Sequence, residues 1–157
     1  FVGCSGDNEA ARWAVDSGHF DSLQTSYSLV DQHARTRGLF EAARSNGVGI
    51  IVKRPVANGV WRRAGSPYQY ADEYFRRARA IQDMGPVEDE PEDPLLTAIG
   101  FVLAQPEVDT VIVGTRNPDH MLSNIEMVEN RLPISEEAVE ELRRRFDELG
   151  NEWTQLG

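Results

Sequence analysis

The stretch VGIIVKRP, residues 48–55, decides the fold class of this chain. Its apolar run does not alternate with polar residues, which is typical of a parallel strand covered on both faces. A helix stop, Asn46-Gly47, comes directly before it. Before that stop, residues 36–45 carry apolar side chains at helical spacing. A helix that leads straight into a buried strand predicts a fold in which strands and helices alternate.

The same alternation runs along the rest of the chain. Short apolar runs predict further strands over Phe1–Cys4, Ser22–Ser26 and 110–113, and amphipathic helices lie between them. Residues 68–84 predict a charged helix, and residues 85–94 a solvated acidic loop. Helix starts are marked by the cap residues Asp7, Asp93, Asn117 and Ser135, the second and third of which precede a proline.

Strands separated by helices predict parallel pairing with right-handed crossovers. Two architectures fit: an open doubly wound sheet, and half of a (β/α)8 barrel, which normally needs about 250 residues. The strand-like first residue favours the half barrel, with four earlier units upstream. We predict an α/β fold, the C-terminal half of such a barrel with four parallel strands and an extra C-terminal helix, over residues 1–149. Residues 150–157 are expected to form a peripheral tail.

Composition excludes several classes of function. The chain has 157 residues and a formal charge of -10, which argues against nucleic acid as a partner because phosphate binding needs a basic face. It has one cysteine, Cys4, so no intrachain disulfide can form. The three histidines have no metal-ligand spacing, so no metal site is predicted. With no apolar run long enough for a membrane span, we expect no membrane contact and a reduced, cytoplasmic location.

The carboxyl ends of the predicted strands are polar and locally basic. They carry Ser5 and Gly6, Gln24 to Tyr27, Lys53 to Pro55, and Gly114 to Arg116. Ligands bind at this edge in both candidate architectures. Donors and positive charge at one edge of an acidic protein suit a phosphorylated small molecule better than a protein partner.

The stretch TVIVGTRNPDHMLSN, residues 110–124, gives the clearest candidate for an anion site. Gly114 lets the backbone approach a ligand closely, and the helix start near Asn117 presents free N–H groups. Arg116 adds a planar fork for phosphate. His120 and Asn124 follow one and two turns later, near the same end. The alternative is that this stretch only turns the chain.

Other residues have structural readings beside the functional ones. Ser5 fits a helix cap as well as an amide contact, and Gln24 fits a bond to loop backbone. Lys53-Arg54, at the end of an apolar strand, needs an anion or acidic neighbours. Asp7 reads as a helix cap, residues 143–145 as a solvated arginine face, and Trp13 as a packing residue. No catalytic triad or carboxylate pair is apparent, so no catalytic residue is assigned.

Together the four strand ends resemble those of the aldo-keto reductases. FVGCSGDNEAARWAV, FDSLQTSYSLVDQ, NGVGIIVKRPVANG and VDTVIVGTRNPDHMLSNIEMV are similar, in order and spacing, to the family's last four strand segments. The resemblance spans residues 1–149. It implies a (β/α)8 barrel that binds NADP(H) in extended form, with NAD as the alternative cofactor.

By position, the resemblance implies roles for the strand-end residues. Ser5 and Gln24 would hold the nicotinamide carboxamide, and the loop from Arg54 and Pro55 to Gly59 would contact the pyrophosphate. Gly114, Thr115 and Arg116 would approach the adenosine 2'-phosphate, with His120 beside it and Asn124 on adenine. Lys53 stands where the family often has an aromatic ring under the nicotinamide, and Gly6 replaces the usual Asn.

The resemblance places the family's catalytic tetrad of Asp, Tyr, Lys and His on the first four βα units, outside this chain. It therefore implies a fragment of an NADP(H)-dependent reductase of small carbonyl substrates, which lacks catalysis without the missing N-terminal half-barrel. Two alternatives remain. One is a non-catalytic, nucleotide-sensing regulatory protein of the same fold, and the other is a half-barrel that self-associates through its open sheet edges.

Overall fold

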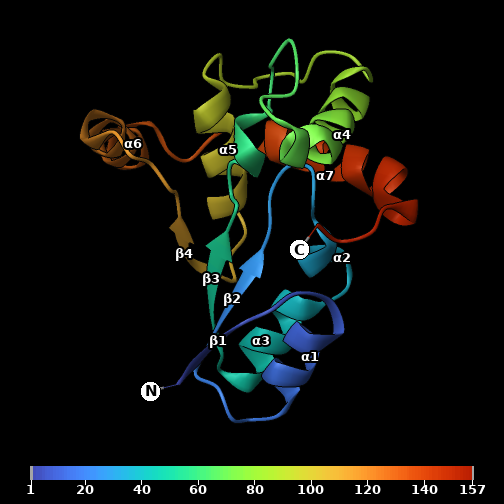
Figure 1. Ribbon diagram of the computed structural model, residues 1–157, viewed down its shortest axis with the longest axis vertical. Coiled ribbons are helices and arrows are strands. Elements are labelled where there is room, and N and C mark those ends of the chain that lie inside the picture. Colours follow the sequence, from blue (N-terminus) through green and yellow to red (C-terminus); the bar gives the residue numbers. More distant parts are fainter. Residues whose placement is uncertain (1, 157) are drawn as a thin grey trace.

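The computed structural model describes residues 2–156, and it contains one sheet of four parallel strands (Figure 1). Their order in space is the order in the chain: β1 (Gly3–Ser5), β2 (Ser22–Ser26), β3 (Gly49–Lys53) and β4 (Val108–Ile112). A doubly wound sheet reverses its strand order at a switch point, whereas a barrel segment does not. The unreversed order confirms the half-barrel prediction. The predicted strand residue Phe1 lies outside the described residues.

Seven α-helices connect and follow the strands within residues 2–156. They are α1 (Asn8–Asp16), α2 (His33–Thr36), α3 (Leu39–Asn46), α4 (Asp72–Gln82), α5 (Pro94–Leu103), α6 (Pro118–Arg131) and α7 (Glu136–Leu149). Three short 3-10 turns are η1 (Ala57–Gly59), η2 (Gln69–Ala71) and η3 (Gly150–Glu152). The extra C-terminal helix is α7, and α2 has no counterpart in the prediction. None of the described helices is long and apolar enough to cross a bilayer.

Three of the four predicted helix caps are confirmed. The Asp93 carboxylate accepts from the N–H of Leu95 at 2.9 Å, and the Asn117 and Ser135 side chains accept from backbone N–H groups at 3.0 and 3.3 Å. The prediction for Asp7 is wrong: it stands at the N-cap position of α1 but makes no capping hydrogen bond. Its carboxylate instead interacts with Thr25 and Ser26 at the end of β2 and with Lys53 at the end of β3.

One face of the sheet is buried under helices and the other is open. On β3, Ile50 and Val52 are fully buried, while Ile51 between them is only partly covered. The expectation that this strand is covered on both faces is therefore wrong. A closed barrel buries its inner face with strands from all sides, and four strands cannot close around it. On β4, Ile112 shares a face with Lys53 and is 47% exposed.

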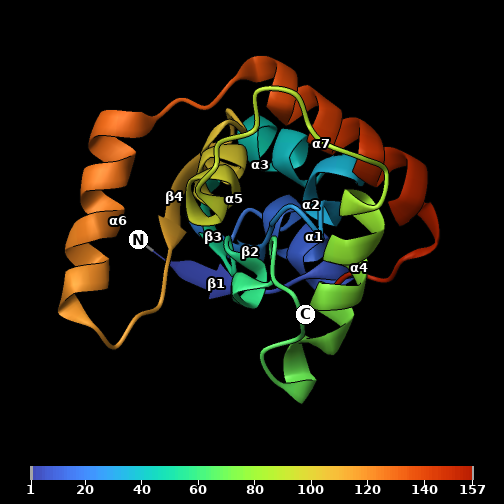
Figure 2. The same cartoon turned by 90° about the horizontal axis from the view of Figure 1, so that it is seen from above.

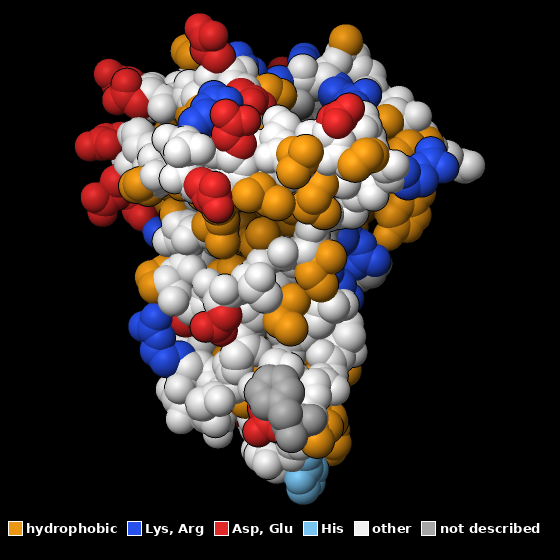
Figure 3. Space-filling model, turned by 90° about the vertical axis from the view of Figure 1, so that its left-hand side faces the viewer, with side chains coloured by type: hydrophobic (Ala, Val, Ile, Leu, Met, Phe, Trp, Pro, Cys, Tyr) orange, Lys and Arg blue, Asp and Glu red, His pale blue; other side chains and the backbone are white. Residues whose placement is uncertain are grey.

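Helix α6 lies beyond β4, where its main contact with the other connecting helices is made to α5 (Figure 2). It exposes four apolar side chains, Met121, Leu122, Ile125 and Val128, of which Leu122 is 66% exposed. We call these four the α6 stripe. Hydrophobic side chains gather across the side of the molecule that carries α6 and β4 (Figure 3). Apolar patches of this kind mark surfaces that meet another chain segment.

Two predictions about side-chain packing are wrong. Arg145 is buried, because its guanidinium donates to the carbonyl oxygens of Ile81, Gly85 and Pro86. The run of three arginines, residues 143–145, is interpreted from the sequence as one solvated face, and within it Arg144 is exposed. Trp13 is 64% exposed, since it lies on the face of α1 opposite the buried Ala11.

The C-terminal segment is held against the body through its backbone. His33 Nε2 lies 2.8 Å from the Trp153 carbonyl oxygen, and the Leu156 N–H donates to Asp31 at 2.7 Å. Arg77 donates to the carbonyl of Thr154 at 2.7 Å. The described part of the expected peripheral tail is therefore anchored on buried residues of α2 and α4 and the loop before α2.

Candidate functional site

The ends of β1 and β2 bring two of the predicted site residues together. Ser5 and Gln24 are directly paired in the sheet register, and the Ser5 hydroxyl lies 3.3 Å from Gln24 Oε1. Both face the open side of the sheet with at least part of their surface exposed. Neighbouring hydroxyl and amide groups can hold a planar amide through one donor and one acceptor.

Lys53, at the end of β3, has an acidic neighbour. Its Nζ lies 2.8 Å from Asp7 Oδ2, while Asp7 Oδ1 accepts from the Ser26 N–H at 2.7 Å and from the Thr25 hydroxyl at 3.0 Å. Burial raises the pKa of Asp7, but hydrogen bonds from Lys53, Ser26 and Thr25 and the Lys53 charge outweigh it and leave that pKa below its ordinary value. The charge of Lys53 is thus matched within the protein.

The loop after β3 has an unusual backbone. Arg54, Ala57 and Asn58 are non-glycine residues in the left-handed region, with φ of 58°, 47° and 60°. Non-glycine residues with this conformation are uncommon, and they cluster at active sites and ligand-binding loops. The Arg54 guanidinium donates to the Ser26 hydroxyl at 2.9 Å, which fixes the loop to the end of β2.

A cavity of about 670 Å³ lies between this loop, the end of β4 and the start of α6. We call it the strand-end cavity. Its lining includes seven predicted site residues: Arg54, Pro55, Gly59, Gly114, Thr115, His120 and Asn124. Of the other predicted residues, Ser5, Gln24, Lys53 and Arg116 are not among its lining residues. The first three lie at neighbouring strand ends, and Arg116 is exposed on the turn before α6.

The charge of the cavity is opposite to that of the protein. Its lining holds two arginines, Arg54 and Arg63, and His120, with no aspartate or glutamate among the described residues that form it. The chain as a whole carries a formal charge of -10. The start of α6 adds N–H groups and the positive end of a helix dipole at the same rim. This arrangement can bind an anionic ligand.

Eight lining residues were not among the predicted site residues: Val56, Asn58, Arg63, Tyr68, Leu95, Ile112, Val113 and Ser123. Val56 and Asn58 lie within the loop that the resemblance assigned as a whole to the pyrophosphate. The Tyr68 hydroxyl donates to Asn58 Oδ1 at 3.1 Å, and Arg63 Nε donates to the Gly59 carbonyl at 2.7 Å. Asn58 Nδ2 is buried and has no hydrogen-bond partner. Arg63 lies in a segment that the sequence marks only as a loop, and Tyr68 stands at the start of a predicted charged helix, so no motif singles either of them out.

The comparisons with known proteins agree with the observed fold. The model of the aldo/keto reductase family matches residues 5–144. The chain belongs to the aldo/keto reductase family. No curated protein matches it in sequence.

Solved structures of the family share the fold of this member. The holo form of aldo-keto reductase AKR11C1 from Bacillus halodurans aligns with a TM-score of 0.71 and 21% identity, over 92% of this chain and 49% of that one. Its apo form aligns with a TM-score of 0.69 and 21% identity, over 90% and 49%. The thermostable aldo-keto reductase Tm1743, in complex with the inhibitor epalrestat, aligns with a TM-score of 0.60 and 19% identity, over 92% and 48%. The chain spans about half the length of these relatives.

The residues present fit the nicotinamide cofactor that the family implies. The cavity supplies cations without acids, and Asn58 Nδ2 is a buried donor that lacks an acceptor. Among the described residues, no group of three or more His, Cys, Asp or Glu side chains is placed to hold a metal ion.

Proposed function

We propose that this chain is the cofactor-binding half of an NADP(H)-dependent oxidoreductase that reduces a carbonyl to an alcohol. In this proposal a complementary half-barrel supplies the catalytic residues, and the chain alone is inactive. The observation that carries the proposal is the strand-end cavity, which is cationic in an acidic protein and lies at the strand ends where barrel enzymes bind ligands. Membership of the family and the span of half a relative's length support it.

The residues take roles along the sheet edge. Ser5 and Gln24 would hold the nicotinamide carboxamide, since their side chains already meet at 3.3 Å. The nicotinamide supplies the hydride when the cofactor is bound. Lys53, oriented by its ion pair with Asp7, would lie under the nicotinamide, where the family often has an aromatic ring. We propose no proton transfer from this chain, because the general acid belongs to the complementary half.

At the other end of the cofactor, backbone and cations would bind the phosphates. The loop from Arg54 to Gly59 would contact the pyrophosphate, and Gly114, Thr115 and His120 would line the adenosine end. Asn124, buried at 8% exposure on α6, would contact adenine from below. A cavity with this many donors pre-placed on strand and helix ends needs little reorganisation to bind.

Titration of the purified chain with NADPH, following nucleotide fluorescence, tests the proposal. We expect saturable binding that is weaker than micromolar, because the chain supplies one side of the site. NADP+ should compete with it. Substitution of Gln24 by Leu should weaken NADPH binding and leave binding of 2',5'-ADP unchanged, since that probe lacks the nicotinamide. Failure to detect NADPH binding at millimolar concentration would refute the proposal.

The open side of the sheet indicates where the complementary half would meet this chain. The α6 stripe and Ile112 expose apolar surface beside the free edge of β4, and β1 forms the other free edge. Unpaired parallel edges and exposed apolar side chains favour association. In the absence of its complement, the chain is expected to self-associate through the same surface, which light scattering over a concentration series would detect.

We also infer a cytoplasmic location, which rests on a single free thiol, Cys4, and an acidic surface. Imaging of a fluorescent fusion in the source cells would test it, and an exported fusion would contradict it.

A further inference from the structure

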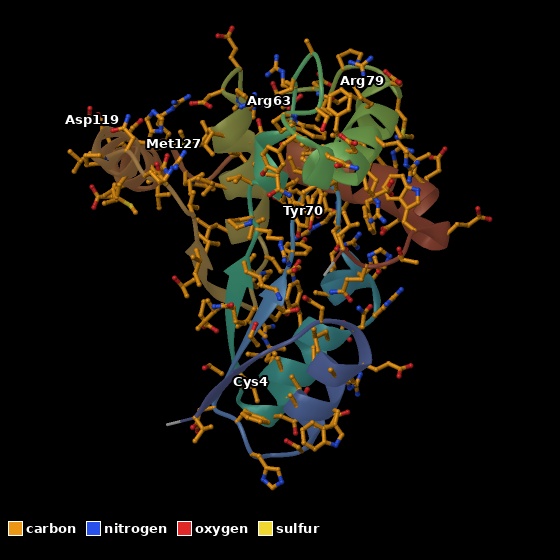
Figure 4. The ribbon with its side chains drawn as sticks, in the orientation of Figure 1. Cys4, Arg63, Tyr70, Arg79, Asp119 and Met127 are labelled. Atoms are coloured by element: carbon orange, nitrogen blue, oxygen red, sulfur yellow. The ribbon has the colours of Figure 1, made fainter. Side chains whose placement is uncertain are left out.

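The basic side chains of the strand-end cavity differ in the contacts that they make. Arg54 donates through Nη1 to the Ser26 hydroxyl at 2.9 Å. His120 lies across the cavity on α6 and is exposed. Arg63 enters from the loop after β3, above the carboxyl end of the sheet (Figure 4). Arg116, the guanidinium that the family resemblance favours, lies outside the lining.

Arg63 is held at one nitrogen and free at the other two. Its Nε donates to the Gly59 carbonyl at 2.7 Å, and no described carboxylate pairs with its guanidinium. Arginines such as Arg76, Arg77 and Arg144 pair with glutamates, so their charge is matched within the protein, whereas that of Arg63 is not. A guanidinium fixed through Nε presents its two Nη groups as a planar fork, the geometry that binds phosphate.

A second donor lies on the same wall of the cavity. The Tyr68 hydroxyl donates a hydrogen bond to Asn58 Oδ1 at 3.1 Å and so orients the side-chain amide of Asn58. In this orientation Nδ2 has no acceptor. Asn58 and Gly59 both have positive φ, so the turn that carries this wall is held in one backbone conformation. A buried donor without an acceptor costs about 1–3 kcal/mol, which an anionic oxygen would recover.

We propose that Arg63, and not Arg116, is the arginine that binds a phosphate group of the dinucleotide, with Asn58 beside it. This rests on the proposed function, because it names the phosphate contact of the same site. The phosphate is either the diphosphate bridge, which NADH and NADPH share, or the 2'-phosphate, which only NADPH carries.

Titrations of the purified chain with NADPH and NADH test the proposal. Arg63→Ala should weaken NADPH binding about tenfold, the cost of one charged hydrogen-bonded contact. Arg62→Ala is the matched control: this neighbour donates to the carbonyls of Pro91 and Glu92 and lies outside the cavity. Arg62→Ala and Arg116→Ala should each stay within about twofold of the parent. Arg63→Lys keeps the charge without the fork and should lie between the parent and Arg63→Ala.

The two nucleotides identify which phosphate is bound. A loss confined to NADPH assigns Arg63 to the 2'-phosphate, and an equal loss for both assigns it to the diphosphate. Either result supports the proposal. If the parent chain binds NADPH and Arg63→Ala binds equally well, or if Arg116→Ala loses more, the proposal for Arg63 fails while the proposed function stands. If the parent chain itself binds neither nucleotide, the proposed function fails and this proposal with it. Arg63 is exposed, so circular dichroism should show an unchanged fold.

Discussion

Lys53 Nζ lies 2.8 Å from Asp7 Oδ2, and this ion pair ties the end of β3 to the loop after β1 across the intervening strand. Asp7 also accepts two hydrogen bonds from the end of β2, so one carboxylate joins three of the four strand ends. Ser5 and Gln24 lie within two residues of these bonded groups, next to the ion pair on the same sheet edge.

Asp7→Asn should lower the free energy of unfolding at pH 7 by about 2 kcal/mol, because it leaves the half-buried Lys53 unpaired. The pKa of Asp7 is lowered in the folded state, so its contribution is present above the ordinary carboxyl pKa of 3.8 and is lost as the pH falls below it. Urea unfolding of parent and variant from pH 7 to pH 3 measures this. A difference that stayed constant down to pH 3 would contradict the assignment, and Asp16→Asn, an exposed carboxylate on α1, is the control.

Arg145→Leu should destabilise the chain by about 3 kcal/mol or more. It removes a buried guanidinium that satisfies the carbonyl oxygens of Ile81, Gly85 and Pro86, and it leaves those oxygens unpaired. The neighbouring Arg144→Leu should leave the free energy of unfolding nearly unchanged, because exposed ion pairs contribute little. Equal effects in guanidinium chloride unfolding would show that Arg145 is not the anchor of the α4–α7 contact.

His33→Ala should release the C-terminal segment from the body. The Trp153 carbonyl can only accept, so His33 Nε2 must carry the proton of that 2.8 Å bond, and alanine removes the donor. We expect faster hydrogen exchange at the Leu156 amide, which is bonded to the adjacent Asp31. The exposed His19→Ala should leave that exchange unchanged. Protection that persists in His33→Ala would mean that Arg77 and Asp31 suffice.

Leu122→Asp with Ile125→Asp should abolish concentration-dependent association of the isolated chain. The two substitutions place charges in the exposed α6 stripe without touching the core, so the fold should persist. Static light scattering from micromolar to millimolar concentration measures the mass. Glu129→Gln, on the same helix, is the control and should behave as the parent. Association that survives the double substitution would place the contact on the β1 edge instead.

Much of the fold could be predicted from local signals. The Asp93-Pro94 and Asn117-Pro118 pairs predict the helix starts of α5 and α6, because the cap and the fixed proline φ act within one turn. Parallel order followed from the alternation of strands and helices. These features depend on neighbours in sequence, so the sequence alone contains them.

The errors concern contacts between distant residues. Asp7 satisfies the cap pattern, yet its carboxylate bonds to residues 18, 19 and 46 positions away, and the competing partners appear only in the folded sheet. Arg145 and Arg144 are the same residue type in one run of arginines, but Arg145 lies on the buried face of α7 with Leu142, and the carbonyl oxygens that accept its hydrogen bonds appear only in the folded protein. The place of Arg63 on the cavity wall could not be predicted, because it depends on the course of the loop after β3 in the folded protein.

The left-handed residues in the loop after β3, Ala57 of η1 among them, have a consequence for directed evolution. Ala57 is held at φ 47°, a conformation that costs an alanine about 1–2 kcal/mol and a glycine almost nothing. Selection for heat resistance is therefore expected to yield Ala57→Gly early, because glycine adopts this conformation without strain. The nucleotide affinity of such variants, measured together with their melting temperature, would show whether the strained conformation of this turn contributes to ligand binding.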